Sequence, residues 1–296
     1  MSQPDTGGRS TKSILSFFGI MTLVFVVGVS LIIFSAGDGI DISGDKVALV
    51  RVEDMILDAE KVNRQIKKWS EDDSVKAIVL RINSPGGAVA PSQEIYQEVE
   101  RAAAIKPVVA SMGAMAASGG YYVAAPCETI YANPGTVTGS IGVIMNLSNI
   151  EKLMEKIGMS PMVIKTGKFK DIGSPYRPMS KEEHELLQNV ADDILVQFIE
   201  DVAKGRGMDL DYVRSLADGR IFTGRQALDL KLVDKLGNLR DAIEAAARMA
   251  KMDPDPDVVE DEEKRGLVKY LLDEDASLAL SRAGLTSGFY FLWPAW

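Results

Sequence analysis

A serine inside a glycine-rich segment and a group of three lysines are the side chains of this 296-residue sequence that could do covalent chemistry. Ser118 lies within GAMAASGGYY, residues 113–122, directly after an apolar run that is typical of a β-strand. Small residues there would let the chain turn tightly into a helix, with Ser118 near the helix N-terminus and the Gly119 amide able to help hold an oxyanion. The alternative is that Ser118 only caps this helix, while Gly119 and Gly120 pack it closely against a strand.

The inventory of possible bases favours lysine as the partner of such a serine. The chain contains one His and one Cys, His184 and Cys127, which cannot supply a zinc tetrad or an internal disulfide. His184 lies near the start of an acidic amphipathic helix, where we interpret it as a solvated or capping residue. We therefore expect no metal and no cofactor, and a base of the kind used in Ser-Lys variants of the catalytic triad.

The lysines that could act as this base are Lys165, Lys168 and Lys170, in the segment IKTGKFKD. A lysine base must be neutral, so burial has to lower its pKa from about 10.4 to about 7–8. Spacing alone does not choose among the three. Asp171 directly follows Lys170 and would favour the charged ammonium unless the two side chains diverge.

A second glycine-bearing segment, NSPGGA at residues 83–88, follows another expected strand. Proline fixes one φ angle, and the two glycines leave backbone amides uncovered. Such amides could line an oxyanion site or a groove for an extended peptide, with Gly86, Gly87 and Ala88 as substrate-binding residues. Taken alone, Pro-Gly-Gly is equally typical of a simple turn.

A third segment, GTVTGSIG at residues 135–142, carries hydroxyl groups. Ser140 could hydrogen-bond and orient the lysine. The alternative is a β-turn filled with polar residues.

The elements that must position these residues alternate between short Val- and Ile-rich runs and longer helical patterns. This alternation predicts an α/β fold. We expect strands at residues 46–52, 76–82, 107–112 and 128–132, with further strand candidates in GSIGVIM and PMVIKTG. We expect helices at residues 58–69, 92–104, 180–204 and 239–251, with a short one opening at Thr223. A capping box at Ser180 to Glu183 marks the start of the third helix.

An uncharged stretch of 22 residues at positions 14–35 is long enough to cross a membrane. As a helix it would span about 33 Å, against a bilayer core of about 30 Å. A cleaved signal peptide is the alternative, but its apolar region is usually shorter. Arg9 and Lys12 precede the stretch, whereas the first charges after it are acidic. We expect a single-pass protein of the cytoplasmic (inner) membrane with its N-terminus in the cytoplasm and the rest outside it.

The last part of the chain differs from the rest. An acidic segment after residue 253 is typical of a solvated, mobile linker, and the final FYFLWPAW is rich in aromatic residues. That end could pack on its own domain, lie at the membrane interface or dock into a groove of a neighbouring subunit. The net charge of −9 argues against nucleic acid as a partner.

Four motifs in order, SPGG, MAASGGYY, TGSIGV and KTGKFKDIGSPYR, resemble the signal peptide peptidase A (SppA, protease IV) family of membrane-anchored serine peptidases, in its short single-domain form. The resemblance covers roughly residues 45–250. It implies a fold similar to the ClpP and crotonase group, built of repeated ββα units. It also implies homo-oligomeric, dome-like rings with the site at a subunit interface, where Ser and Lys can come from adjacent protomers.

The resemblance assigns roles that spacing left open. It implies Ser118 as nucleophile and Lys170 as general base, with Ser140 orienting the lysine and the Gly87 and Gly119 amides as oxyanion donors. The expected organisation is an N-terminus at 1–13, a transmembrane helix at 14–35, a linker at 36–45, a peptidase domain at 46–252 and a tail at 253–296.

The expected reaction is hydrolysis of hydrophobic peptides, such as signal-peptide remnants left in the membrane. Lysine would take the serine proton, and the serine would form an acyl-enzyme that water then releases. A crotonase-like acyl-CoA enzyme and a non-catalytic membrane scaffold are the alternatives. An exported domain argues against the acyl-CoA enzyme, because CoA is found in the cytosol.

Overall fold

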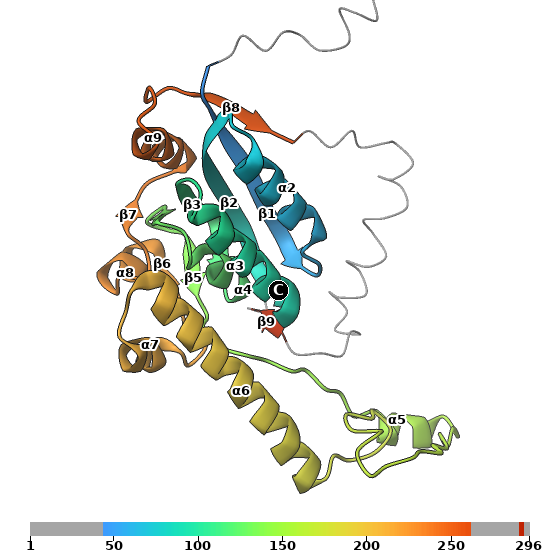
Figure 1. The fold of residues 1–296 in the computed structure, drawn as a ribbon. Coiled ribbons are helices and arrows are strands. Elements are labelled where there is room, and N and C mark those ends of the chain that lie inside the picture. Colours follow the sequence, from blue (N-terminus) through green and yellow to red (C-terminus); the bar gives the residue numbers. More distant parts are fainter. Residues whose placement is uncertain (1–43, 262–289, 293–296) are drawn as a thin grey trace, which may run out of the picture. The chain divides into compact units, whose positions relative to one another are not determined.

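The computed structural model describes residues 44–261 and 290–292 (Figure 1). The predicted transmembrane helix at residues 14–35 lies outside the described residues. Within the described part of the chain, no helix combines the length and the apolar character needed to cross a membrane. The described residues from Asp45 onward form one compact unit.

A mixed nine-stranded sheet organises the unit, with the order β6-β5-β3-β2-β1-β8 along its main path. β4 pairs with β3 and β7, and β9 pairs with β2. The β5–β6 and β2–β9 pairs are antiparallel and the other pairs are parallel. The strands are β1 (Lys46–Ile56), β2 (Val75–Ala88), β3 (Val108–Ala117), β4 (Thr129–Ala132), β5 (Val137–Gly139), β6 (Ile221–Thr223), β7 (Lys235–Leu236), β8 (Asp257–Glu260) and β9 (Tyr290–Leu292).

Helices cover both faces of this sheet (Figure 1). Because side chains alternate along a strand, Ile78 and Leu80 of β2 join the main core, while Ala77 and Val79 pack with alanines of α9. Burial on both faces explains why the central strands are continuous apolar runs. The helices are α2 (Glu60–Glu71), α3 (Val89–Ala103), α4 (Gly119–Ala124), α5 (Glu151–Lys156), α6 (Lys181–Arg206), α7 (Leu210–Leu216), α8 (Gly224–Asp229) and α9 (Leu239–Met249).

The four expected strands and the predicted capping box are confirmed, and β1, β2 and β3 each extend further than predicted. α6 begins with the expected capping box between Ser180 and Glu183, and α8 begins with one at Thr223. β2 continues through the segment predicted as a Pro-Gly-Gly turn, because β1 pairs with it as far as Gly87. β3 likewise continues to Ala117, where β5 is its partner.

Three other predictions are wrong. GSIGVIM leaves the strand conformation after Gly139, where β5 ends. PMVIKTG forms no strand, and its Met162 and Ile164 are 88% and 94% exposed, so no sheet is present to bury them. The acidic segment is not wholly a solvated linker, since Asp257–Glu260 forms β8 against β1. Ion pairs from Arg51 to Glu260 and from Lys68 to Asp261 accompany this edge strand.

Candidate active site

Ser118 occupies the sharp junction between β3 and α4. Its φ of 53° and ψ of −117° lie in a region that residues other than glycine rarely adopt. The Ser118 N–H donates to the Gly139 carbonyl at 2.8 Å, and its carbonyl accepts from the Tyr122 N–H at 2.8 Å. Strained backbone of this kind persists where the surrounding structure imposes it, and it concentrates at functional sites.

The Ser118 hydroxyl is buried and has no hydrogen-bond partner. The residue is 1% exposed, and Oγ makes no hydrogen bond within the described structure. Ser118 is the N-cap residue of α4, and Gly120 packs closely on the Ser84 carbonyl of β2, as the alternative interpretation expects, but the Ser118 side chain makes no capping hydrogen bond. A buried hydroxyl without a partner costs free energy, which makes it a specific site for an incoming polar group.

Ser140 lies next to Ser118 because of the parallel register of β3 and β5. Ala117 is paired with Gly139, so the two serines are the next residues at the ends of neighbouring strands. Ser140 also has a positive φ, 52°, is 5% exposed, and donates its N–H to the Arg220 carbonyl at 2.8 Å. The register thus places a second hydroxyl residue at the same sheet end as the nucleophile candidate.

The Gly86–Gly87–Ala88 segment lies at the end of β2, against β1. Gly86 has a φ of 97°, and its N–H donates to the Ser84 Oγ at 3.1 Å. A Cβ on Gly87 would lie 2.0 Å from the Ile56 carbonyl oxygen, closer than atoms can approach. The close packing of β1 therefore requires glycine at position 87.

Strand β9 occupies the opposite side of this segment. Its backbone pairs antiparallel with β2, with Gly86, Gly87 and Ala88 opposite residues 292, 291 and 290. The pairing of β3 with β2 ends at Ser84 and Ala116, so β9 takes the position that β3 vacates just before Ser118. Of the three interpretations of the C-terminal segment, packing on its own domain describes this strand. A peptide that binds to the same edge must displace β9.

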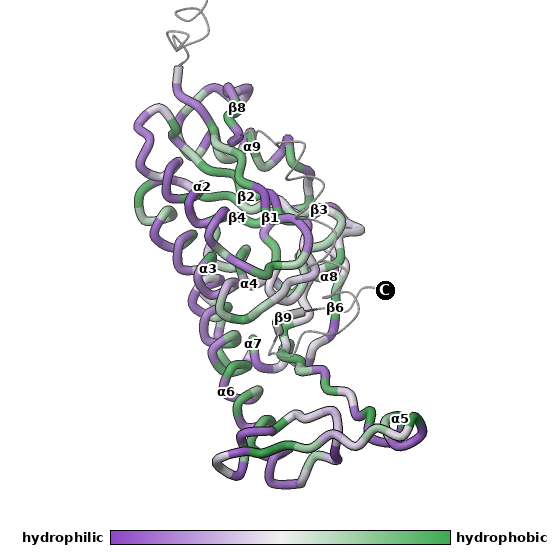
Figure 2. The backbone as a smooth tube through the Cα atoms, turned by 90° about the vertical axis from the view of Figure 1, so that its right-hand side faces the viewer, coloured by the Kyte–Doolittle hydropathy of each residue, from purple (hydrophilic) through white to green (hydrophobic). Residues whose placement is uncertain are grey.

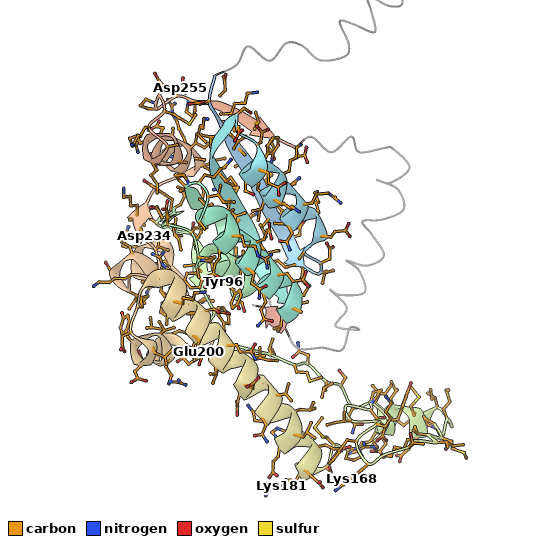
Figure 3. The ribbon with its side chains drawn as sticks, viewed as in Figure 1. Tyr96, Lys168, Lys181, Glu200, Asp234 and Asp255 are labelled. Atoms are coloured by element: carbon orange, nitrogen blue, oxygen red, sulfur yellow. The ribbon has the colours of Figure 1, made fainter. Side chains whose placement is uncertain are left out.

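The three lysines lie on a segment of loops and turns around α5, at the N-terminal end of α6 (Figures 1 and 2). Lys165 pairs with Asp171, and Lys168 pairs with Glu182. Lys170 is exposed, and its Nζ has no hydrogen-bond or ion-pair partner among the described residues. Figure 3 shows Lys168 beside Lys181, whereas Glu200 lies further along α6 toward the sheet. Lys165 and Lys168 are therefore held in ion pairs, whereas no described group binds the Lys170 amine.

One chain does not bring Ser118 and Lys170 together in this structure. The Ser118 Oγ has no partner, and the backbone hydrogen bonds of the α5 segment are made within it, as from the Ile150 N–H to the Pro175 carbonyl at 2.7 Å. Both views show this segment away from the sheet (Figures 1 and 2). The Ser118 hydroxyl and the Lys170 amine both lack a described partner, and they lie on separate parts of the same unit.

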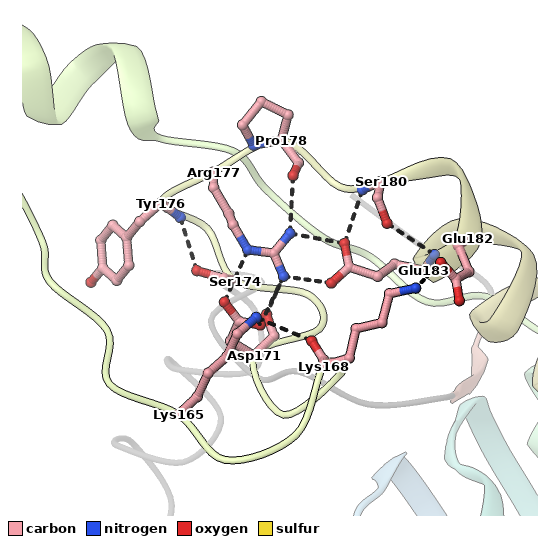
Figure 4. A network of polar contacts seen from close by, with 10 residues as sticks. All are labelled: Lys165, Lys168, Asp171, Ser174, Tyr176, Arg177, Pro178, Ser180, Glu182 and Glu183. Atoms are coloured by element: carbon pink, nitrogen blue, oxygen red, sulfur yellow. Dashed lines mark hydrogen bonds and ion pairs between the residues drawn. The ribbon is translucent and has the colours of Figure 1, made fainter.

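A network of charges that no sequence spacing predicts joins the loop that carries Lys170 to the start of α6 (Figure 4). Arg177 binds both Asp171 and Glu183, and its N–H groups reach Asp171 at 2.9 Å. These bonds lower the pKa of Asp171 below its ordinary value, through Arg177 first and Lys165 second. Arg177 and the Ser180 amide also lower the pKa of Glu183, to about 2. The contacts join residues of a loop, where no periodicity marks which side chains meet.

The remaining titratable candidates do not contribute chemistry to this site. His184 is exposed in the first turn of α6. Cys127 is buried, and desolvation raises the pKa of its thiol to about 12. No cluster of His, Cys, Asp or Glu within the described ranges could hold a metal ion. A cavity of about 970 Å³ lies beside the end of β1 and β8, but Ser118 does not line it.

Comparison with protein families gives two matches. Residues 100–253 match the model of "Peptidase family S49", and residues 49–136 match that of "Clp protease". The second match and the mixed sheet describe a ClpP-like α/β fold. A solved ClpP1 mutant of Listeria monocytogenes aligns with a TM-score of 0.45 at 16% identity, covering 66% of this chain and 93% of that one.

Several curated proteins are similar in sequence. "Putative protease slr0021" of Synechocystis sp. is 45% identical over 79% of this chain and 85% of its own length. "Putative protease MJ0651" of Methanocaldococcus jannaschii is 37% identical over 84% of this chain and 88% of its own length. "Protease 4" of Haemophilus influenzae is 34% identical over 79% of this chain and 39% of its own length.

Proposed function

Because the chain belongs to peptidase family S49, within the SppA (protease 4) group of serine peptidases, we propose that it is a membrane-anchored endopeptidase with a Ser118/Lys170 dyad. Its substrates are hydrophobic peptides, such as cleaved signal peptides. Membership of a peptidase family removes the reason to consider an acyl-CoA enzyme or a scaffold.

In the proposed mechanism, neutral Lys170 removes the Ser118 proton and Oγ attacks the peptide carbonyl. The Gly87 and Gly119 amides stabilise the oxyanion, and Ser140 orients the lysine. The lysine then protonates the leaving amine, which departs and leaves an acyl-enzyme. Water activated by the same lysine releases the acid and regenerates Ser118.

The single observation that carries the proposal is the strained, buried Ser118 with an unpartnered Oγ at the end of β3. Two features support it. The Gly86–Ala88 edge already accepts one extended segment in antiparallel pairing, which is how a peptide substrate would add to the sheet. Lys170 is the lysine of the three whose amine is not held in an ion pair.

We propose that Lys170 reaches Ser118 across a subunit boundary in a homo-oligomeric ring. Lys170 is exposed in the single chain, whereas a base must be desolvated to be neutral. The same segment exposes large apolar side chains, among them Met162 and Ile164, which a neighbouring copy would cover. Burial against that copy would supply both the contact and the desolvation.

The proposed location is the cytoplasmic membrane, with a single span at residues 14–35 and the peptidase outside the cytoplasm. The basis is the uncharged stretch with Arg9 and Lys12 before it. This arrangement would keep the site near peptides that remain in the bilayer.

The test is hydrolysis of a hydrophobic peptide amide by the full chain in detergent. Ser118→Ala and Lys170→Ala should each lose at least about 10³-fold in kcat/KM. Lys168→Ala is the matched control, and we expect it to retain most activity because Lys168 pairs with Glu182. Retained activity in folded Ser118→Ala or Lys170→Ala would exclude the dyad.

The pH dependence provides a separate check on the lysine. Wild-type kcat/KM should rise from about pH 7 to about pH 9 as the base loses its proton. A flat or falling profile over that range would exclude a lysine base.

A further inference from the structure

The guanidinium group of Arg177 joins two carboxylates, one in the loop that carries Lys170 and one in α6, beside the separate Lys168–Glu182 ion pair (Figure 4). Its Nε and one terminal nitrogen donate to the two carboxylate oxygens of Asp171, both at 2.9 Å. The other terminal nitrogen donates to Glu183 at 2.8 Å and to the Pro178 carbonyl at 3.1 Å. A planar guanidinium can serve two carboxylates at once, which an ammonium cannot do with the same geometry.

We call the Arg177 guanidinium and its two carboxylate partners, Asp171 and Glu183, the clamp. Its α6 partner, Glu183, is held in place by further contacts. Glu183 is 4% exposed and accepts from the Ser180 N–H at 2.9 Å, as part of the capping box. Further along the same helix, Phe198 and Val202 are fully buried in the main core. Arg177 therefore links the Lys170 loop, through a continuous helix, to the packed body of the unit.

Arg177 also binds the carboxylate that follows Lys170 in the sequence. Asp171 is the next residue in the chain, and a free carboxylate there would favour the protonated, inactive lysine. Arg177 and Lys165 bind the Asp171 oxygens instead. The titratable groups of the loop and of the α6 N-terminus that surround this position are Lys165, Lys168, Asp171, Arg177, Glu182 and Glu183, and their described ion pairs join them to one another.

We infer that Arg177 is a positioning residue for the catalytic lysine, holding the Lys170 loop on α6 and keeping the Asp171 carboxylate away from the Lys170 amine. The inference rests on the proposed role of Lys170 as base. The described side-chain contacts of Arg177 are with Asp171, Pro178 and Glu183, so in this inference it acts through the two carboxylates.

The test compares pH profiles of kcat/KM for wild type, Arg177→Met and the double variant Arg177→Met/Asp171→Asn, all as full chains. Arg177→Met should lower kcat/KM at neutral pH about 10-fold or more, because the reaction rate falls steeply when a catalytic base is displaced from its position. Its rising limb should move about 0.5–1 pH unit higher, because Asp171 then keeps only Lys165 as a cationic partner and its less neutralised carboxylate favours the Lys170 ammonium. The double variant should return the limb to the wild-type position while keeping part of the rate loss. Arg177→Lys should lie between wild type and Arg177→Met.

Arg240→Met is the matched control, because Arg240 makes an exposed ion pair with Glu244 on α9. We expect a wild-type profile for it. If the rising limb of the kcat/KM profile stays at the wild-type pH in folded Arg177→Met, the inference is overturned even if the rate falls. A lower rate without a shift in pH would show only that the variant has lost structure. If Lys170→Ala is active, the dyad itself fails. If Lys170→Ala is inactive and Arg177→Met has the wild-type profile, only the role of Arg177 fails.

Discussion

The sheet end that carries Ser118 and the loop that carries Lys170 are ordered by different physical forces. Ser118 and Ser140 are buried, and their positions follow from strand register, close glycine packing and a core on both faces of the sheet. The Lys170 loop exposes apolar side chains and is held by ion pairs of Arg177 with Asp171 and Glu183. The proposed nucleophile is thus ordered within one chain, whereas the proposed base depends on charge pairing and on a neighbouring copy.

The largest effect should come from mixing two inactive variants. If Ser118 and Lys170 meet across a subunit boundary, oligomers assembled from equal amounts of Ser118→Ala and Lys170→Ala should regain roughly one quarter of wild-type activity. Each variant alone should be inactive. Co-expression with two affinity tags isolates the mixed oligomers. Absence of recovery in verified mixed oligomers would mean that each chain pairs its own two residues.

The next largest effect is expected from a substitution at the buried sheet end that carries Ser118. Gly87→Ala should reduce kcat/KM by at least about 100-fold, because its Cβ would displace the amide proposed for the oxyanion. It should also lower the free energy of unfolding by about 1–3 kcal/mol through overpacking against Ile56. Gly135→Ala is the control, since a Cβ there meets nothing within 4 Å. Activity and thermal stability equal to wild type in Gly87→Ala would contradict the close approach of β1.

A smaller effect of opposite sign is expected when β9 is removed. Deletion of residues 287–296 should raise kcat/KM for a peptide by about 3- to 10-fold, because the Gly86–Ala88 edge no longer has to be vacated. A variant that lacks only residues 294–296 retains β9 and is the control. A synthetic peptide of residues 287–296 should inhibit the deletion variant competitively. Unchanged kinetics in the deletion variant would show that β9 does not compete with substrate.

The smallest effect is local and appears in acid. The pKa of Glu183 is lowered from 4.5 to about 2, so its stabilising contribution is complete above pH 4.5 and is lost as pH falls through about 2. The lowered pKa of Asp171 acts with the same sign. Hydrogen exchange should therefore show the Lys170 loop losing protection in acid before strands β1 to β3. Equal loss in both regions would remove the distinction between them.

The parts of the fold that the sequence predicts are those with a local signal. Residues 76–82 and 107–112 are recognisable as buried strands because both faces are apolar, and Ser180 and Thr223 are recognisable as caps by the residues three positions later. The extension of β2 through Pro-Gly-Gly has no such signal. It depends on pairing with β1, and local propensity alone favours a turn.

The candidate site divides in the same way. One His and one Cys in the whole chain already direct attention from histidine to lysine, and the glycine-rich segment marks Ser118. Spacing does not separate Lys170 from Lys165 and Lys168. The structure distinguishes them by their partners, since Asp171 and Glu182 hold the other two.

By itself, the sequence determined the chemical inventory and the buried strands, because composition and periodicity are local properties of the chain. Only the tertiary structure decided that Ser118 and Ser140 are neighbours, that β8 and β9 join the sheet, and that Arg177 holds the Lys170 loop. These contacts join residues far apart in sequence or within an irregular loop. Their geometry is set by strand register and charge pairing, which no repeating pattern along the chain encodes.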